Sequence, residues 1–144
     1  MQRILVTVDG SEHALRGVEY LARVIKEGAL LGGPGEVHLI NVQSRPSPAV
    51  ARAFAAAELA AYYQEQYDSA HRAAEDLLRT AGVPFHRHDR QGSIAQTIVA
   101  VAQELHCDQI VMSTQGAGSL GGMLLGSVAS KVIHLTNVPV TLVK

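Results

Sequence analysis

The sequence predicts an α/β fold in which helices cover both faces of one parallel sheet. Short, almost continuously apolar runs rich in β-branched residues recur along the chain, as in strands that are buried on both faces. Stretches with apolar residues at helical spacing separate these runs. The chain has 144 residues, 47% hydrophobic and 17% charged, which is enough apolar surface to fold without disulfides or metals. We expect a single domain over residues 1–144.

Five segments have the composition of strands: Ile4–Val8, Val37–Val42, Val83–Asp89, Gln109–Met112 and Val138–Val143. The second of them follows the turn signal Gly-Gly-Pro-Gly at 32–35. The third alternates apolar and polar residues, which predicts an edge strand. Parallel strands joined by helical crossovers then form a five-stranded, doubly wound sheet of the Rossmann-like or flavodoxin-like kind, for which we expect the strand order 3-2-1-4-5.

Helices are predicted between the strands, over Leu15–Ile25, Ala49–Thr80 and Ile94–Leu105. The Ala-rich middle stretch is interpreted as one long helix or two, ending at Gly82. Its tyrosines share the apolar stripe, so we expect them to pack against the sheet or another subunit. Ser93, with Gln96 three residues later, has the capping-box pattern, and Ser47 precedes a proline suited to a first helical turn.

Composition argues against several classes of partner. The net charge is -1, so the chain lacks the excess of Lys and Arg that nucleic acids and anionic membranes attract. The start, MQRILVTVDGSE, lacks the apolar core of a signal peptide, and no apolar run approaches the roughly 18 residues of a membrane span. The lone cysteine, Cys107, is interpreted as a small hydrophobe. We expect a cytoplasmic protein that binds neither nucleic acid nor membrane.

A glycine-rich segment from Ser113 to Ser127 is the strongest functional signal. Five glycines fall within eleven residues, between a predicted strand and a predicted helix that begins near Gly126. Glycines allow close approach of the backbone, and the first amides of a helix attract anions. No Asp or Glu follows Asp108. The segment is therefore predicted to hold phosphate groups at the carboxyl ends of the strands.

Two familiar glycine motifs match this segment but fail on mechanism. Gly116, Gly118 and Gly121 have the dinucleotide spacing, yet that motif opens the first strand–helix turn and needs an acid about twenty residues later. Gly121 and Gly126 have the spacing of a Walker loop, but Ser127 stands where its lysine is required. NAD binding and fast phosphoryl transfer are not expected.

A third pattern resembles the universal stress protein family, over Ile4–Lys144. Gly116, nine residues and then Gly126-Ser127 follow the spacing of its ATP-binding members, and ILVTVDGSE near the start and HLTNVPVTLVK at the end are similar to the family. Two positions depart from that pattern. Ser113 replaces the first glycine of the motif, and Thr7 replaces a proline that many relatives carry.

This resemblance implies a nucleotide site at the strand ends. Asp9 would face the ribose or adenine, although an Asp before Gly10-Ser11 also suits a turn. The backbone near Val42 would line the adenine pocket, and the later glycines would hold the phosphates. The implied nucleotide-binding residues are Thr7, Asp9, Val42, Ser113, Gly116, Gly126, Ser127 and Val128. The implied ligand is ATP or AMP, with Mg²⁺ as a further candidate.

Patterns for metal binding and catalysis are weak. His86 and His88 share one face of a strand, but zinc needs three or four ligands and Asp89 points to the opposite face. No metal site is therefore predicted. The other histidines are interpreted as surface or helix-end residues: His13, His38, His71, His106 and His134. There is no GxSxG elbow and no evident pair of carboxylates, so no catalytic residue is predicted.

The leading hypothesis is a regulatory protein of the stress response that binds ATP and hydrolyses it slowly at most. The alternative is a dimeric interaction module that does not bind nucleotide, which Ser113 favours. A hydrolase of the related adenine-nucleotide class is a third candidate. The last run, Val138–Val143, is short and apolar and is predicted to lie at a sheet edge. The resemblance implies that this strand pairs with its copy in a homodimer.

Overall fold

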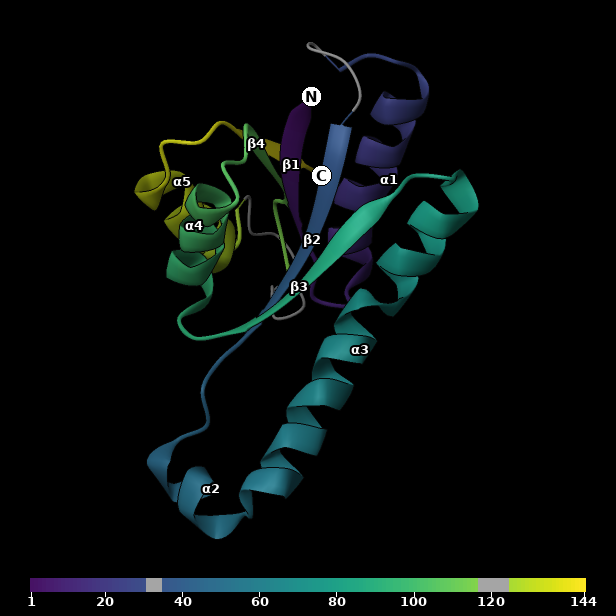
Figure 1. Ribbon diagram of the computed structural model, residues 1–144. Helices are drawn as coiled ribbons and strands as arrows, with labels where there is room; N and C mark the ends of the chain where they lie inside the picture. Colours follow the sequence, from purple (N-terminus) through teal and green to yellow (C-terminus); the bar gives the residue numbers. More distant parts are fainter. Residues whose placement is uncertain (31–34, 117–124) are drawn as a thin grey trace.

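A computed structural model describes residues 1–30, 35–116 and 125–144 (Figure 1). Five parallel strands form one sheet in the order β3-β2-β1-β4-β5, as predicted, with β3 and β5 at its edges. The strands are β1 Gln2–Thr7, β2 Gly35–Gln43, β3 Phe85–Gln91, β4 Gln109–Ser113 and β5 Val140–Val143. The helices are α1 Glu12–Lys26, α2 Pro48–Ala53, α3 Ala56–Ala81, α4 Ile94–Glu104 and α5 Ser127–Leu135. Most of the predicted 32–35 turn, together with Gly118 and Gly121, lies outside the described residues.

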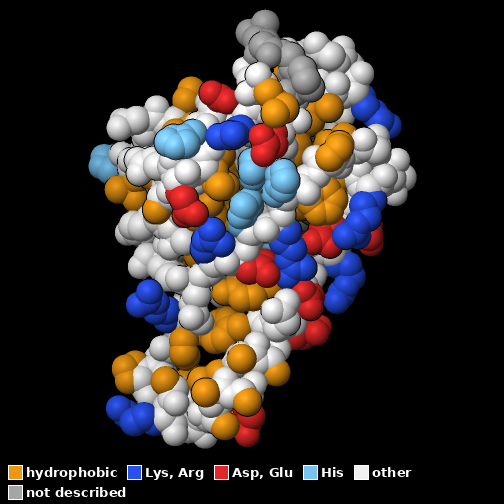
Figure 2. Space-filling view, viewed as in Figure 1, with side chains coloured by type: hydrophobic (Ala, Val, Ile, Leu, Met, Phe, Trp, Pro, Cys, Tyr) orange, Lys and Arg blue, Asp and Glu red, His pale blue; other side chains and the backbone are white. Residues whose placement is uncertain are grey.

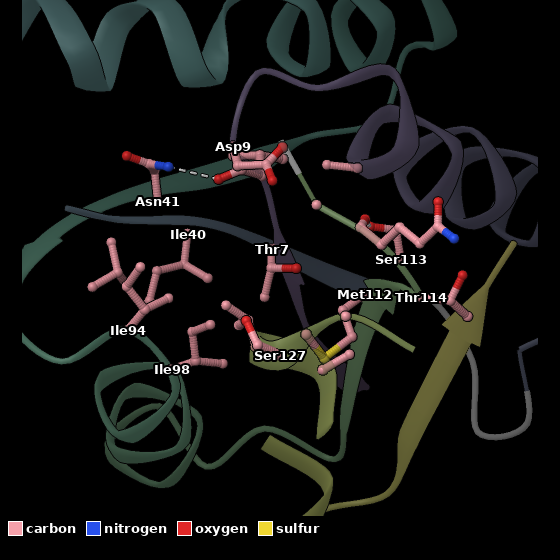
Figure 3. Close-up of a pocket in the computed structure, with 18 of the residues that line it drawn as sticks. Thr7, Asp9, Ile40, Asn41, Ile94, Ile98, Met112, Ser113, Thr114 and Ser127 are labelled. Atoms are coloured by element: carbon pink, nitrogen blue, oxygen red, sulfur yellow. Dashed lines mark hydrogen bonds between the residues drawn. The ribbon is translucent and has the colours of Figure 1, made fainter. Parts of the chain in front are cut away.

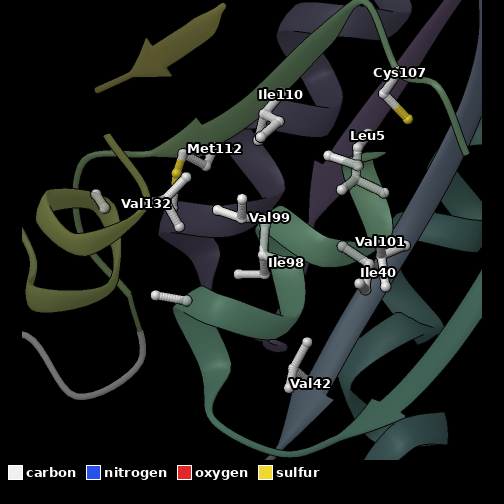
Figure 4. Packing of buried hydrophobic residues seen from close by; sticks show 13 residues of the cluster. Leu5, Ile40, Val42, Ile98, Val99, Val101, Cys107, Ile110, Met112 and Val132 are labelled. Carbon is white, nitrogen blue, oxygen red and sulfur yellow. The ribbon is translucent and has the colours of Figure 1, made fainter. Parts of the chain in front are cut away.

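Helices cover both faces of the sheet, with α4 and α5 on one face and α1 and α3 on the other (Figure 1). Successive strand residues point to opposite faces, so each strand contributes to two cores. In one core, Leu5 and Ile110 pack with Ile98 and Val132 (Figure 4). In the other, Ile4 and its neighbours pack against α1 and α3. Each large aliphatic side chain buried in this way stabilises the fold by about 1.5–3 kcal/mol.

Serine side chains cap the first turns of α1 and α2. The Oγ of Ser11 accepts a hydrogen bond from the amide of Ala14 at 3.1 Å, and the Oγ of Ser47 accepts one from the amide of Val50 at 3.3 Å. Ser93 is the N-cap of α4, but its side chain makes no capping hydrogen bond. The capping box predicted there is therefore wrong, because the spacing places the residue without fixing its rotamer.

The stretch predicted as one helix or two is two helices. Phe54 and Ala55 have extended backbone and separate α2 from α3. At its other end α3 stops at Gly82, whose φ of 70° is in the left-handed region that favours glycine. The residues of α3 that are buried begin only at Ala70. Accordingly, α2 and the first turns of α3 project beyond the sheet (Figure 1).

The tyrosines of α3 attach this helix to the carboxyl ends of two strands. Tyr63 donates a hydrogen bond from its hydroxyl to the carbonyl of Ser44, and Tyr67 donates one to the carbonyl of Arg90, both at 2.9 Å. Packing against the sheet is therefore confirmed for these two side chains. No helix in the described segments is long and apolar enough to cross a membrane.

The interpretation of five histidines as surface or helix-end residues is wrong for two of them. His38 is 5% exposed and His71 is fully buried. His38 lies in β2 and faces neighbouring strand residues, whereas His71 lies where α3 packs on the sheet. Cys107 is buried as predicted, and its burial raises the pKa of the thiol to about 11.

Candidate functional site

A cavity of about 500 Å³ opens at the carboxyl ends of β1, β2 and β4, beside the start of α5 (Figure 3). This volume is within the range of small-molecule sites, about 300–1,000 Å³. Along the chain, β2 and β3 are added on one side of β1, whereas β4 and β5 are added on its other side. The strand order therefore reverses between β1 and β4. Ligands of open α/β sheets bind at such a reversal.

The structure brings all eight residues proposed from the sequence to this cavity. Its lining includes Thr7, Asp9, Val42, Ser113, Gly116, Gly126, Ser127 and Val128. They come from four separate parts of the chain, and parallel pairing places the ends of their strands side by side. The cavity is also lined by apolar and amide side chains that the sequence analysis did not identify, chiefly Ile40, Asn41, Ile94, Ile98 and Met112.

Asp9 lies in the turn that joins β1 to α1. Its Oδ1 accepts a hydrogen bond from the amide of Ser11 at 2.9 Å, and Gly10 between them has a φ of 82°. The turn expected from the sequence is therefore present. The same carboxylate also faces the cavity, because a Cβ placed on Gly116 would lie 2.9 Å from Asp9 Oδ2. One residue thus closes the turn and forms part of the wall.

Asn41 holds two of the strand ends in place. It is buried within β2, and its Nδ2 donates a hydrogen bond to the carbonyl of Val8 at 2.7 Å (Figure 3). Its Oδ1 accepts one from Gln43 Nε2, also at 2.7 Å. A buried amide with both groups paired adds rigidity to the wall of a site. The signal in the sequence was a single polar residue within the apolar run LINV.

The two sides of the cavity differ in character. Ile40, Ile94 and Ile98 lie together on one side in Figure 3, whereas Ser113 and Thr114 lie on the other. The apolar side comes from β2 and α4, whose residues also belong to one of the cores. Such a surface suits a flat, weakly polar group, and the opposite side suits a group that needs hydrogen bonds.

The start of α5 forms the polar end of the cavity. Gly126 is the N-cap, no side chain in the described segments caps the helix, and the amide of Gly126 donates to the carbonyl of Thr114. A Cβ on Gly126 would lie 3.2 Å from that carbonyl oxygen, so any other residue would push the two backbones apart by a few tenths of an ångström. The first amides of α5, which have no acceptor within the helix, begin at the cavity wall formed by Ser127 and Val128.

Ser113 is a buried part of the cavity wall whose hydroxyl binds the loop that follows β4. It is 8% exposed at the end of β4, and its Oγ donates a hydrogen bond to the carbonyl of Gln115. The hydroxyl therefore folds back on the following loop. Among the described residues that line the cavity, Asp9 is the only one with a charged side chain. The described part of the wall thus supplies no Lys, Arg or His to bind an anion.

Together the fold and the cavity define an α/β protein with a cavity at the topological switch point, where ligands of such sheets bind. The model of the universal stress protein family matches residues 1–144, and the chain belongs to this family. The chain is 32% identical to universal stress protein MJ0531 of Methanocaldococcus jannaschii over 145 residues, which cover 99% of this chain and 82% of that protein.

Solved structures share the fold. The structure of hypothetical protein MJ0577 superposes with a TM-score of 0.81 at 26% identity, covering 99% of this chain and 95% of the other. A universal stress protein in complex with cAMP superposes with a TM-score of 0.71 at 22% identity, covering 99% and 97%. This second likeness concerns the fold alone.

Proposed function

We propose that the protein binds ATP in this cavity and acts as a nucleotide-responsive regulator in the stress response. One observation carries the proposal: residues of four chain segments, chosen from the sequence as nucleotide-binding, line a single cavity that ends at the start of α5. AMP would occupy the same adenosine-binding part. We further propose that the protein works in the cytoplasm.

The adenine would lie against the apolar side of the cavity. Ile40, Ile94 and Met112 offer aliphatic and thioether contacts to a flat ring, and the backbone near Val42 offers hydrogen-bonding groups to its edge. The ribose would then be near Asp9, whose carboxylate accepts hydrogen bonds from hydroxyl groups. The universal stress protein solved in complex with cAMP shows that a protein of this fold can hold an adenine nucleotide.

The phosphates would lie at the start of α5. Gly126 lets the backbone approach closely there, and helix amides with their dipole stabilise a phosphate without a cationic side chain. Mg²⁺ usually takes one or two carboxylates plus phosphate oxygens. Asp9 is the residue of the described lining that would hold it, and the ion would supply charge neutralisation of the phosphates.

The proposed role is regulatory because the described wall has little catalytic equipment. It contains no Lys, Arg or His to stabilise a phosphoryl group in transfer, and Asp9 already accepts a hydrogen bond from Ser11. Hydrolysis would therefore be slow at most. Binding would act by changing the relative stability of conformations or complexes.

A matched pair of substitutions in α5 tests the proposal. Ser127→Glu places a carboxylate at the cavity, whereas Ser130→Glu places the same charge on an exposed position one turn later, outside the lining. We expect Ser127→Glu to weaken ATP binding more than about tenfold, because like charges repel, and Ser130→Glu to leave it nearly unchanged. Calorimetry with Mg-ATP measures both. Absence of ATP binding at millimolar concentration in the folded, unsubstituted protein would refute the proposal.

A second candidate function is a dimeric interaction module without nucleotide. It is favoured by Ser113, which fills the first glycine position of the ATP motif and orders the loop through its own hydrogen bond to Gln115. Native mass spectrometry of gently purified protein separates the two candidates, since co-purified ATP or AMP contradicts the module. In either case we propose a homodimer through Val138–Val143, which includes the edge strand β5.

A further inference from the structure

Two amide side chains near the end of β2 form a chain of hydrogen bonds that ends at the candidate nucleotide site. Nδ2 of Asn41 donates to the carbonyl of Val8, and Nε2 of Gln43 donates to Oδ1 of Asn41, both at 2.7 Å. Asn41 is buried, Gln43 is partly buried, and both residues line the cavity. The hydrogen bonds therefore connect the backbone after β1 with a side chain in the cavity wall.

These hydrogen bonds fix which end of each amide is the donor. The carbonyl of Val8 can only accept, so Asn41 turns its NH₂ group toward it and leaves Oδ1 as the acceptor for the next bond. Gln43 must then present its own NH₂ group to Asn41, because rotating either amide would place two acceptor oxygens against each other. The remaining polar atom, Gln43 Oε1, accepts no hydrogen bond from the described residues.

Gln43 lies beside the apolar side of the cavity. Its carbonyl accepts a hydrogen bond from the amide of Gly92 at 2.9 Å, which holds the end of β2 next to the start of α4. Ile94, the first residue of α4, belongs to the apolar side. Beyond Gln43 the chain passes to the projecting α2 and α3, which carry mainly hydrophobic side chains on the face shown in Figure 2. Specificity at this end of the cavity therefore depends on neutral hydrogen bonds.

We propose that Gln43 selects nucleotides whose base carries an amino group at ring position 6, as adenine does, over bases with an oxo group there, such as hypoxanthine and guanine. This inference rests on the proposed nucleotide site and assigns its base specificity to one side chain. Oε1 of Gln43 would accept a hydrogen bond from the amino group. An oxo group would bring two acceptors together, and the amide cannot rotate without losing its bond to Asn41.

Three nucleoside triphosphates that differ at ring position 6 test the proposal by calorimetry. ATP has an amino group there, purine ribonucleoside triphosphate has a hydrogen, and ITP has an oxo group. We expect the affinity to fall in this order, with ATP bound at least about tenfold more tightly than ITP, because a hydrogen bond is first lost and then replaced by repulsion. The ribose and the phosphates are common to all three and cancel in the comparison.

Gln43→Met and Gln91→Met form a matched pair of substitutions. Methionine has a similar length but lacks the amide oxygen and nitrogen. Gln91 lies opposite Gln43 in the register of β2 and β3, is exposed, and does not line the cavity. We expect Gln43→Met to reduce the preference for ATP over ITP at least about fivefold, and Gln91→Met to leave it unchanged.

Asn41 is a positioning residue, and Asn41→Leu tests that role. The substitution removes the acceptor that orients Gln43, so the freed amide can turn its NH₂ group toward the oxo group of ITP. We expect ITP to gain affinity relative to ATP, whereas a purely structural defect weakens both nucleotides equally. Thermal unfolding checks the fold of each variant.

The possible results separate this inference from the proposed function. Equal binding of ATP and ITP by the unsubstituted protein, or the full preference retained in Gln43→Met, would overturn the role of Gln43 and leave the nucleotide site standing. Binding of none of the three triphosphates would overturn both.

Discussion

Asp9 and Gly116 come from the loops after β1 and β4 and meet across the candidate nucleotide site. The space for a Cβ at Gly116 is taken by the Asp9 carboxylate, at 2.9 Å. Real Cβ atoms do not tolerate so short a contact, so a side chain at position 116 displaces the carboxylate or the loop. A side chain at position 116 is thus opposed by the end of the Asp9 side chain, not by an unusual backbone angle.

We predict that Gly116→Ala weakens ATP binding about tenfold while the protein stays folded, because the methyl group moves Asp9 away from the ribose. Calorimetry measures the affinity and thermal unfolding monitors the fold. Asp9→Ala removes the colliding carboxylate, so adding Gly116→Ala to this variant is expected to weaken ATP binding little further. Fully additive losses in the double variant would contradict this coupling.

The packing of helix α3 against strand β3 buries a titratable histidine side chain. His71 of α3 is fully buried with its Nε2 3.0 Å from Asp89 Oδ1, although neither ring nitrogen makes a well-formed hydrogen bond in the described structure. Arg87 of β3 and Glu75 of α3 also face it, and Arg87 binds Asp89 and Asp68 at 3.0 and 2.8 Å. Burial lowers the pKa of His71, nearby Arg87 lowers it further, and Asp89 and Glu75 oppose this.

This burial predicts a loss of stability in mild acid. As the pH falls below about 6.5, His71 takes up a proton more readily in the unfolded chain than in the folded protein, so the unfolding free energy decreases. One such group contributes at most about 1.4 kcal/mol per pH unit. Urea unfolding measures this free energy. Between pH 7 and 5 we expect the unfolding free energy of His71→Leu to decrease less than that of the unsubstituted protein. If His13→Leu, a substitution on α1, reduces the pH dependence of the unfolding free energy by the same amount, the effect cannot be assigned to His71.

For the whole molecule, the open edge of the sheet is the important surface. β5 pairs with β4 on one side and is the last strand of the sheet, and its Leu142 is 37% exposed. An apolar edge strand of this kind favours pairing with another copy. Pro139, whose carbonyl accepts from the amide of Ile110, precedes the strand and cannot donate to a partner.

We predict that Leu142→Lys converts the proposed homodimer to monomers at micromolar concentration, because a buried lysine at the interface loses its hydration. Sedimentation velocity measures the change. Val50→Lys alters a similarly exposed apolar residue on α2, at 40% exposure, and is expected to leave the dimer intact. A monomeric unsubstituted protein, or a dimeric Leu142→Lys, would exclude pairing through β5.

For the molecule as a whole, the sequence was enough to predict the α/β class, the strand order and the edge position of β3 and β5. These properties follow from local periodicity and from the short list of topologies that parallel strands allow. Boundaries shifted by up to three residues. The last strand begins at Val140 and not Val138, since Pro139 has no amide to donate.

What the sequence by itself determined is the fold and the glycine-dependent end of the cavity, because both depend on residues close together in the chain. Only the tertiary structure decided the apolar wall around Ile40 and Ile94, the burial of His71, and the hydrogen bond from Asn41 to Val8. These contacts depend on the register between strands and on which helix face is covered. Both are set by packing among distant segments, which no local pattern encodes.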